Sequence, residues 1–488
     1  MRGWGEGFAD DACDGRAGSG RTGTDAEKDI DTGVCRNHNG LNRIKSGGKG
    51  HGAMMNLDEK IAALANGLAG KMVECRRDLH RHPETGWTEF RTASMVVRQL
   101  RELGYDVQFG KDVMEESERM GVPSAEVLTE HMQRAVRQGA DPTLVEAMKG
   151  GYTGVVGTMD FGRSGKTVAL RFDMDCNDVV EAAEDAHRPH REGFASVNPG
   201  CMHACGHDGH TTAGLAVAEI LASLREELCG RVKFIFQPAE EGVRGARAMA
   251  AKGVVDDADY LLGAHLMMPK VGYLGYDVTG FLATSKFDAD FTGVPAHAAG
   301  APEVGRNALM AAATAALNLQ AITRSSKGST RINVGVLNAG SGRNVIPDHA
   351  HLEVETRGAT TEIDEEVFDR AEHILRGAAE MQGVSVKITR MGGAASGNNS
   401  PELSERIRTI AQRLNIFDEL GTMHNIGGSE DCSYFMERVQ KHGGQAVYLI
   451  IGGSLAAVNH NNYFDFDEHA LTLEAQLLAS ATADLLKG

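Results

Sequence analysis

The densest group of reactive side chains lies in a nine-residue segment, 202–210, which contains three histidines and one cysteine and precedes a helix-like run at 211–224. Thiolates and imidazoles are ligands of transition metals, and a loop containing glycine can turn several of them toward one ion. The segment therefore predicts a metal site built around Cys205 and His207. Histidines beside a helix start are also often caps or surface residues, so this segment alone leaves both interpretations open.

Further potential ligands stand where predicted strands end. Apolar, strand-like runs occupy 167–172, 232–236 and 260–264. The side chains that follow these runs are Asp173, Asp175, Glu240, Glu241 and His265. In open α/β sheets the carboxyl ends of the strands form the ligand crevice. We therefore expect these side chains to converge on the same site as Cys205 and His207.

The neighbouring carboxylates Glu240 and Glu241 suit a division of labour in hydrolysis. One can bind a metal ion while the other takes a proton from water that the ion activates. Metal binding lowers the pKa of water from about 15.7 to about 7, so a nucleophile for amide cleavage becomes available at neutral pH. Adjacent carboxylates are usually a solvated surface pair, but these two follow a Gln-Pro-Ala segment directly after an apolar strand. Their placement favours the crevice.

The elements around these residues indicate an α/β fold. Buried strand runs alternate with helical runs over 154–264 and return at 446–451, as in a doubly wound sheet. Between 281 and 395 the order changes to strand, helix, strand, strand, helix, strand, which is the ferredoxin-like split motif. We therefore expect a catalytic domain made of residues 54–280 and 396–488, interrupted by an inserted α+β domain at 281–395.

The first 53 residues differ from the rest of the chain. They are rich in glycine and contain few large apolar side chains, too few to offset the entropy of ordering them. Helical periodicity begins only near Leu57. We expect residues 1–53 to be a disordered or untranslated extension.

Charge and composition exclude several classes of partner. The formal net charge is −17, which opposes binding to nucleic acid and to anionic membranes. No apolar run reaches the ~18 residues that a membrane span needs, and the chain start lacks the apolar core of a secretory signal. The eight cysteines are spread too thinly for a disulfide framework. These features predict a cytoplasmic protein with reduced thiols.

A set of ordered motifs connects this chain to a known family. The motifs are Met-His-Ala-Cys-Gly-His-Asp at 202–208, Gln-Pro-Ala-Glu-Glu-Gly at 237–242, Ala-His at 264–265, Gly-Val-Pro-Ala-His-Ala at 293–298, Asn-Val-Ile-Pro at 344–347 and Gly-Ser-Glu-Asp at 428–431. From about residue 57 onward the sequence resembles the M20 metallopeptidases, specifically their amidohydrolase branch. The resemblance implies a zinc-peptidase-like catalytic domain with an inserted lid that forms the dimer interface.

The resemblance also implies roles for individual residues. The expected ligands of two divalent metal ions are Cys205, His207, Glu241, His265 and His460. Glu240 would be the general base and acid, and Asp175 would orient the ligands without touching the metal. Asp173 stands where many M20 enzymes carry a ligand histidine, and we assign it no role. A thiolate ligand favours zinc, whereas relatives in the branch are often associated with manganese; we expect manganese and keep zinc open.

The inserted lid is expected to complete the site. By resemblance, His297 would reach the active site of a partner subunit, where it would stabilise the oxyanion of the tetrahedral intermediate. Asn344 and Arg357 would contact the substrate. Arg343 and Arg357 could also clamp the carboxylates of an acidic substrate, although a plain surface role fits either arginine equally well.

The expected substrate is an N-acyl amino acid. Segments at 116–123, 187–196 and 340–344 resemble a subgroup of the branch that hydrolyses p-aminobenzoyl-glutamate to p-aminobenzoate and glutamate, and that is known with a related second subunit. We therefore expect a homodimer or a heterodimer with such a subunit. The alternatives are a general aminoacylase, a hydrolase of indole-acetyl amino acids, and a metal-binding regulatory protein without activity. Glu240 speaks against the last, because a protein that only binds metal has no need of it.

Overall fold

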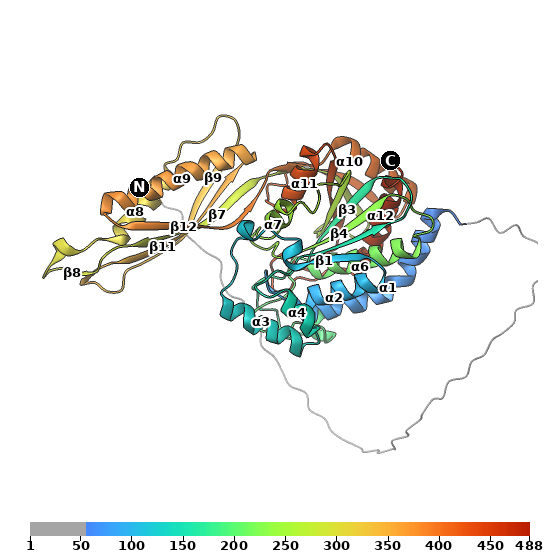
Figure 1. The fold of residues 1–488 in the computed structure, drawn as a ribbon, viewed down its shortest axis with the longest axis horizontal. Helices are drawn as coiled ribbons and strands as arrows, with labels where there is room; N and C mark the ends of the chain where they lie inside the picture. Colours follow the sequence, from blue (N-terminus) through green and yellow to red (C-terminus); the bar gives the residue numbers. More distant parts are fainter. Residues whose placement is uncertain (1–54) are drawn as a thin grey trace, which may run out of the picture. The chain divides into compact units, whose positions relative to one another are not determined.

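The computed structural model describes residues 55–488. The predicted extension at 1–53 lies outside the described residues. The strands form two main sheets, each packed with helices around a hydrophobic core of its own, and one two-stranded ribbon (Figure 1). None of the helices within 55–488 combines the length and the apolar character that a membrane span requires.

The larger sheet has nine strands in the order β1-β2-β4-β3-β5-β15-β6-β13, with β14 also paired to β6. Their bounds are β1 (Asp106–Phe109), β2 (Val155–Asp160), β3 (Thr167–Asp173), β4 (Arg231–Gln237), β5 (Tyr260–Met267), β6 (Tyr273–Phe281), β13 (Gly397–Asn398), β14 (Glu419–Met423) and β15 (Gln445–Gly452). The central strands β4, β3, β5 and β15 are mutually parallel. They are almost entirely buried, as expected when helices cover both faces of a parallel sheet.

The edges of this sheet depart from the expected parallel pattern. β2 runs antiparallel to β4, and β6 runs antiparallel to β15, so the sheet is mixed. β6 and β14 were not predicted as strands. Antiparallel edge strands on a parallel sheet are common in doubly wound folds, and strand direction depends on long-range pairing that local sequence patterns do not encode.

Helices cover both faces of the larger sheet. The main ones are α1 (Leu57–Arg81), α2 (Phe90–Glu102), α6 (His207–Ser223), α7 (Ala246–Ala251), α10 (Pro401–Leu414), α11 (Cys432–Lys441) and α12 (His469–Leu485). α1, α6 and α12 contact one another, and Figure 1 shows α6 and α12 on the opposite side of the sheet from α7 and α11. The predicted doubly wound arrangement is confirmed.

The helices between α2 and β2 are short, and one predicted helix begins earlier than expected. Residues 113–149 hold a short 3-10 turn (Glu116–Glu118) followed by α3 (Ala125–Arg137) and α4 (Pro142–Ala147). Gly139 has a left-handed φ of 94°, and Pro142 starts α4 at a position where its missing N–H costs nothing. The helix expected at 211–224 begins earlier, at His207, so two of the three clustered histidines lie on its first turn.

The smaller sheet lies within residues 281–395. Its four antiparallel strands follow the order β12-β7-β11-β9, and two helices pack on one face. The elements are β7 (Ala283–Thr292), α8 (Ala308–Gln320), β9 (Thr330–Ala339), β11 (His349–Gly358), α9 (Thr361–Gln382) and β12 (Ser385–Ala394). This is the predicted ferredoxin-like order. Asn307 and Thr360 cap the two helices, each accepting a hydrogen bond from a backbone N–H in the first turn.

Alternation along β7 explains which face of the smaller sheet is buried. Phe287, Ala289 and Phe291 point to the helices and are almost fully buried. Lys286 and Asp288 point to the other face, because successive side chains on a strand alternate. A short ribbon of β8 (Ala296–His297) and β10 (Val345–Ile346) extends from the same part of the chain.

Candidate metal centre

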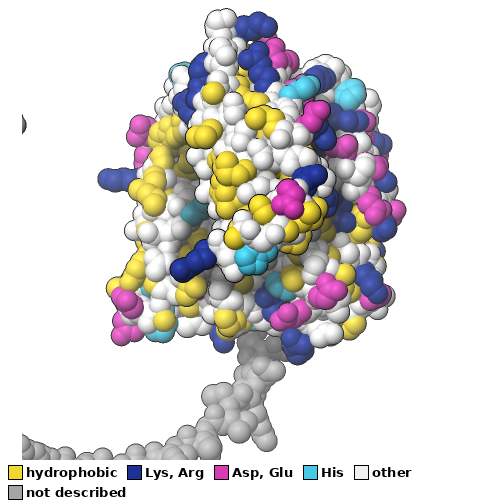
Figure 2. Space-filling model, turned by 90° about the vertical axis from the view of Figure 1, so that its left-hand side faces the viewer, with side chains coloured by type: hydrophobic (Ala, Val, Ile, Leu, Met, Phe, Trp, Pro, Cys, Tyr) yellow, Lys and Arg dark blue, Asp and Glu magenta, His cyan; other side chains and the backbone are white. Residues whose placement is uncertain are grey.

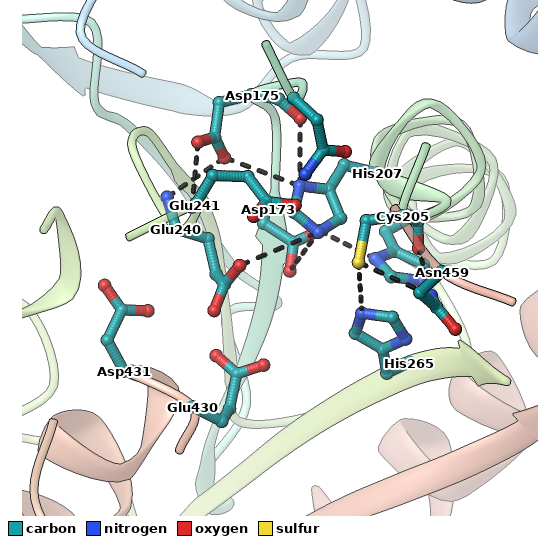
Figure 3. A network of polar contacts seen from close by, with 12 residues as sticks. Asp173, Asp175, Cys205, His207, Glu240, Glu241, His265, Glu430, Asp431 and Asn459 are labelled. Atoms are coloured by element: carbon teal, nitrogen blue, oxygen red, sulfur yellow. Dashed lines mark hydrogen bonds and ion pairs between the residues drawn. The ribbon is translucent and has the colours of Figure 1, made fainter. Parts of the chain in front are cut away.

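Side chains from distant parts of the sequence meet at the carboxyl ends of the parallel strands (Figure 3). Asp173 ends β3, Glu240 and Glu241 follow β4, and His265 lies near the end of β5. A cavity of about 430 Å³ opens at this edge. Five of the six residues expected to bind metal or carry protons line it: Cys205, Glu240, Glu241, His265 and His460. His207 lies buried beneath them.

The surroundings of Cys205 favour the thiolate form of its side chain. Its sulfur lies 3.4 Å from Nε2 of His265. Burial alone would raise the pKa of Cys205, but the neighbouring His265 and His207 lower it to about 6. The next residue, Gly206, caps α6 with a φ of 97°, a conformation that favours glycine. This sharp turn brings the thiolate and the first residue of the helix to the same place.

Two imidazoles direct a free nitrogen inward. Nδ1 of His207 hydrogen-bonds the carbonyl oxygen of Asp175 at 2.9 Å, and Nδ1 of His265 hydrogen-bonds that of Leu266 at 2.7 Å. A carbonyl only accepts, so Nδ1 carries the proton in both rings. Nε2 of His207 is buried and has no hydrogen-bond partner within residues 55–488. An orphaned ring nitrogen oriented by its other nitrogen is typical of a metal ligand.

The expected ligands fall into two triplets that share one sulfur. Cys205, His207 and His265 form one, and Cys205, Glu241 and His460 form the other; within each triplet the ligand atoms lie within 4.8 Å of one another. The second triplet is negatively charged: burial would raise the pKa of Glu241, but the nearby His460 and His207 hold it at about 2. The donor set offers places for two divalent cations.

His460 reaches the cavity from a loop far along the chain. Its φ is 66°, and its backbone N–H donates to the carbonyl of Ala204 at 2.7 Å. Nε2 of His460 lies 3.5 Å from Oε1 of Glu241. Hydrogen bonds with Cys205 and Glu241 raise the pKa of His460 to about 10. The backbone contact thus ties this half-exposed ring to the cysteine loop.

The pKa of Glu240 is shifted in the opposite direction from that of its neighbour Glu241. Burial, reinforced by the charges of Glu430 and Glu241, raises its pKa well above the usual range. Its carboxyl group lies 3.8 Å from Nε2 of His207. A raised pKa in a carboxyl group beside metal ligands suits an acid–base catalyst, which must both take up and release a proton.

Asp175 holds the turn that carries both glutamates. One carboxylate oxygen accepts the backbone N–H of Glu240 at 3.0 Å, and the other accepts that of Glu241 at 2.9 Å. The turn contains Ala239 with a φ of 52°, a strained value for a residue with a side chain. Asp175 therefore contributes by placing the two functional carboxylates.

His210 and Asp173 have structural partners. Nε2 of His210 accepts the backbone N–H of Leu266 at 2.9 Å, and Nδ1 hydrogen-bonds Asp173 at 2.6 Å. Asp173 also accepts from Arg171 at 2.6 Å. Both nitrogens of His210 are occupied, so His210 has no free atom for a metal ion, in contrast to His207 on the same helical turn.

A buried network around Arg171 was missed by the sequence interpretation. Arg171 is fully buried, and it donates to Gln237 at 2.7 Å and to Glu430 at 3.0 Å. Tyr448 donates to the same Glu430 at 2.6 Å. The Gly-Ser-Glu-Asp motif and a charged residue inside an apolar strand were the available signals. The network places Glu430 in the cavity wall beside Glu240.

Residues expected on the lid are divided between two places. Arg357 lines the cavity, together with Lys286, which the sequence interpretation did not select. His297, Arg343 and Asn344 lie at the β8–β10 ribbon instead: His297 is paired with Val345, and Ala298 donates to the carbonyl of Asn344 at 3.0 Å. These three residues do not line the cavity of their own chain.

Comparison with known proteins decides the family. Residues 169–483 match the family described as Peptidase family M20/M25/M40. The chain belongs to the M20 peptidase family. The resemblance in its motifs is thereby confirmed, and the chain is a metal-dependent amidohydrolase of this family.

Three M20 relatives cover most of this chain. It is 49% identical to indole-3-acetyl-aspartic acid hydrolase of Enterobacter agglomerans over 84% of this chain and 95% of that protein. It is 48% identical to the A subunit of p-aminobenzoyl-glutamate hydrolase of Escherichia coli strain K12 over 86% and 97%. The crystal structure of aminobenzoyl-glutamate utilization protein from Klebsiella pneumoniae aligns with a TM-score of 0.74 at 40% identity, over 87% of this chain and 98% of that one.

Proposed function

We propose that this M20 enzyme hydrolyses the amide bond of N-acyl amino acids, with p-aminobenzoyl-glutamate as its substrate and p-aminobenzoate and glutamate as products. The observation that carries the proposal is the position of the Glu240 carboxyl group beside two triplets of metal-ligand side chains on one cavity. Apolar side chains in the same wall, Met267, Phe281 and Ile426, suit an aromatic acyl group.

The proposed ligands are Cys205, His207, Glu241, His265 and His460. Two divalent ions bound there supply Lewis-acid activation of water and of the amide carbonyl. Manganese is the proposed metal and zinc the alternative that the thiolate favours. Metal analysis of the purified protein distinguishes them.

Glu240 carries the protons in the proposed mechanism. In its ionised form it takes a proton from the attacking water, and it then delivers that proton to the amide nitrogen as the bond to the amino acid breaks. Asp175 keeps Glu240 and Glu241 at fixed positions during both transfers. Arg357, in the cavity wall, would bind a carboxylate of the amino-acid half.

Residues 281–395 are proposed to be the lid and dimerisation domain, with 54–280 and 396–488 as the catalytic domain. Apolar side chains are exposed on the smaller body, among them Met310, Leu317 and Leu337, and Figure 2 shows hydrophobic side chains interspersed with charged ones on the face at this end. β9 is one of the two edge strands of its sheet. A partner chain, either a second copy or a related B subunit, would cover this surface.

His297 and Asn344 lie at the β8–β10 ribbon and do not line the cavity of their own chain. We therefore infer that they act at the cavity of the partner subunit. His297 would donate to the oxyanion of the tetrahedral intermediate. Its Nδ1 accepts the backbone N–H of Gly300 at 3.0 Å, which leaves Nε2 of this exposed ring as the protonated, donating nitrogen. Arg343, which precedes Asn344 in the chain, would contact the substrate's carboxylates.

A second candidate function is hydrolysis of indole-acetyl amino acids, because one relative of about the same identity carries that name. Turnover of p-aminobenzoyl-glutamate, indole-3-acetyl-aspartate and N-acyl conjugates of neutral amino acids separates the possibilities. The proposal expects the highest kcat/KM on p-aminobenzoyl-glutamate. Equal or faster turnover of neutral conjugates contradicts it, and a general aminoacylase then describes the enzyme.

A further inference from the structure

Two basic side chains line the cavity beside the metal centre. They are Lys286 and Arg357, the one lysine and the one arginine among the residues that line this cavity. The rest of the polar lining is mixed: it includes the carboxyl groups of Glu240, Glu241 and Glu430, and also the imidazoles of His265 and His460. Glu430 and the other glutamates would repel a substrate carboxylate that lies away from the metal ligands, and Lys286 and Arg357 can offset that repulsion.

The smaller sheet places these two cations side by side. β7 and β11 are antiparallel, with Lys286 opposite Glu355 and Thr284 opposite Arg357. Residues directly opposite share a face, and so do residues two positions apart on one strand, so Lys286 and Arg357 are diagonal neighbours on the same face. Diagonal neighbours lie roughly 7–8 Å apart, within reach of long side chains.

The two cations differ in their existing partners. Arg357 already forms an ion pair with Glu355 at 2.9 Å. Lys286 forms no ion pair with an acidic residue within 55–488, and it is half-buried in the cavity wall. Glu355 stands opposite Lys286 but pairs with Arg357, so Lys286, which lines the cavity, can bind an anion that enters it.

We propose that Lys286 selects substrates whose amino-acid half carries a second carboxylate. Arg357, whose planar fork matches a carboxylate, would bind the α-carboxylate common to all N-acyl amino acids, and Lys286 would bind the side-chain carboxylate of glutamate or aspartate. The names of both relatives at about half identity contain an acidic amino acid, aspartate in one and glutamate in the other. The inference rests on the proposed function and narrows it to dicarboxylic amino acids.

The test compares two substrates that differ only in the side chain of the amino acid, which ends in a charged carboxylate in one and in a neutral amide in the other. p-Aminobenzoyl-glutamate and p-aminobenzoyl-glutamine share the acyl group, the scissile amide and the α-carboxylate. Lys286→Met removes the charge and keeps an unbranched side chain; Lys286→Arg keeps the charge. Lys387→Met is the matched control, because Lys387 is exposed on β12 of the same sheet and does not line the cavity.

Lys286→Met is expected to lower kcat/KM for the glutamate conjugate by roughly 10- to 100-fold, the loss typical of a charge-assisted hydrogen bond. Most of the change should appear in KM. The glutamine conjugate should change less than about threefold, Lys286→Arg should retain most of the preference, and Lys387→Met should match wild type. The selectivity ratio, rather than the rate alone, identifies the role of Lys286.

Three results would overturn the inference: no effect of Lys286→Met, an equal loss on both conjugates, or a wild-type enzyme without preference for glutamate over glutamine. The last leaves amide hydrolysis intact. If the wild type hydrolyses neither conjugate, the proposed function fails. The role of Lys286 is then tested by calorimetry, which measures the binding of free glutamate and free glutamine to the wild type and to Lys286→Met. Equal affinities of the wild type for both amino acids would overturn the inference independently of catalysis.

Discussion

The sulfur of Cys205 lies 3.4 Å from Nε2 of His265, while Nδ1 of that ring is tied to the carbonyl of Leu266. The ring is thus locked with its free nitrogen toward the thiolate. Because Cys205 also belongs to the triplet with Glu241 and His460, this one sulfur joins the two halves of the site.

Cys205→Ala is therefore expected to weaken the binding of both metal ions. The loss of metal affinity should exceed the about 10- to 100-fold that follows removal of an orienting partner. Metal content after dialysis measures it. Cys229→Ser, at a half-buried thiol remote from the cavity, should retain wild-type metal content; two tightly bound ions in Cys205→Ala would contradict the shared ligand.

Glu240→Gln should abolish proton transfer while leaving the metal ligands in place. We expect kcat to fall by roughly 10²- to 10⁴-fold with metal stoichiometry unchanged. Single-turnover rates and metal analysis on the same preparation measure the two effects. Wild-type hydrolysis by this variant would exclude Glu240 as the proton carrier.

Asp175→Asn removes one of the two acceptors that hold the backbone of Glu240 and Glu241. An amide nitrogen cannot accept an N–H, so one of the two hydrogen bonds is lost and the turn loosens. Activity or metal affinity should fall by about 10- to 100-fold. The exposed neighbour Asp178 provides the control: Asp178→Asn should behave as wild type, and equal effects of the two substitutions would deny Asp175 a special role.

His297 can be tested by mixing subunits. Glu240→Gln and His297→Ala should each be nearly inactive alone, but a mixed dimer pairs an intact Glu240 site with an intact His297 from the other chain. In a random mixture about half of the dimers are mixed and each has one complete site, so roughly a quarter of wild-type activity should return. Failure to recover activity after subunit exchange, verified by mass spectrometry, would contradict the shared site.

We expect the buried carboxyl group of Glu474 to make the free energy of unfolding fall as the pH rises. It is fully buried on α12 without hydrogen-bond partners for its carboxyl oxygens within 55–488, and burial, with a smaller contribution from Asp173, raises its pKa from 4.5 to about 8. The folded state therefore holds a proton that the unfolded state releases above pH 4.5, and stability falls as pH rises toward 8, by at most about 1.4 kcal/mol per pH unit.

Glu474→Met should remove this dependence. Its melting temperature relative to wild type should rise between pH 5 and pH 8, as measured by calorimetry on the metal-loaded protein. Glu219, on α6 and paired with Lys71 near the surface, gives a control in Glu219→Met. A constant difference between Glu474→Met and wild type across this pH range would show that Glu474 is not protonated in the folded state.

Much of the site could be predicted because local patterns carry it. The apolar runs that end before Asp175, Glu240 and His265 marked strand ends, and strand ends of a parallel sheet share one edge. Ferredoxin-like order at 281–395 was likewise visible, since amphipathic periodicity depends on neighbours in the chain. Residue types set the chemistry: a thiolate, imidazoles and paired carboxylates.

Other features depended on contacts between distant segments. Only the folded chain shows that His210 uses both nitrogens on Asp173 and Leu266, so that it is no ligand, while His207 keeps one free. In the same way, alternation along β7 shows that Lys286 and Phe287 face opposite sides, but not which side meets the cavity. The sequence determined which groups can bind metal and move protons; tertiary packing decided which of them have a free atom facing the substrate, because hydrogen-bond partners and cavity walls come from segments hundreds of residues apart.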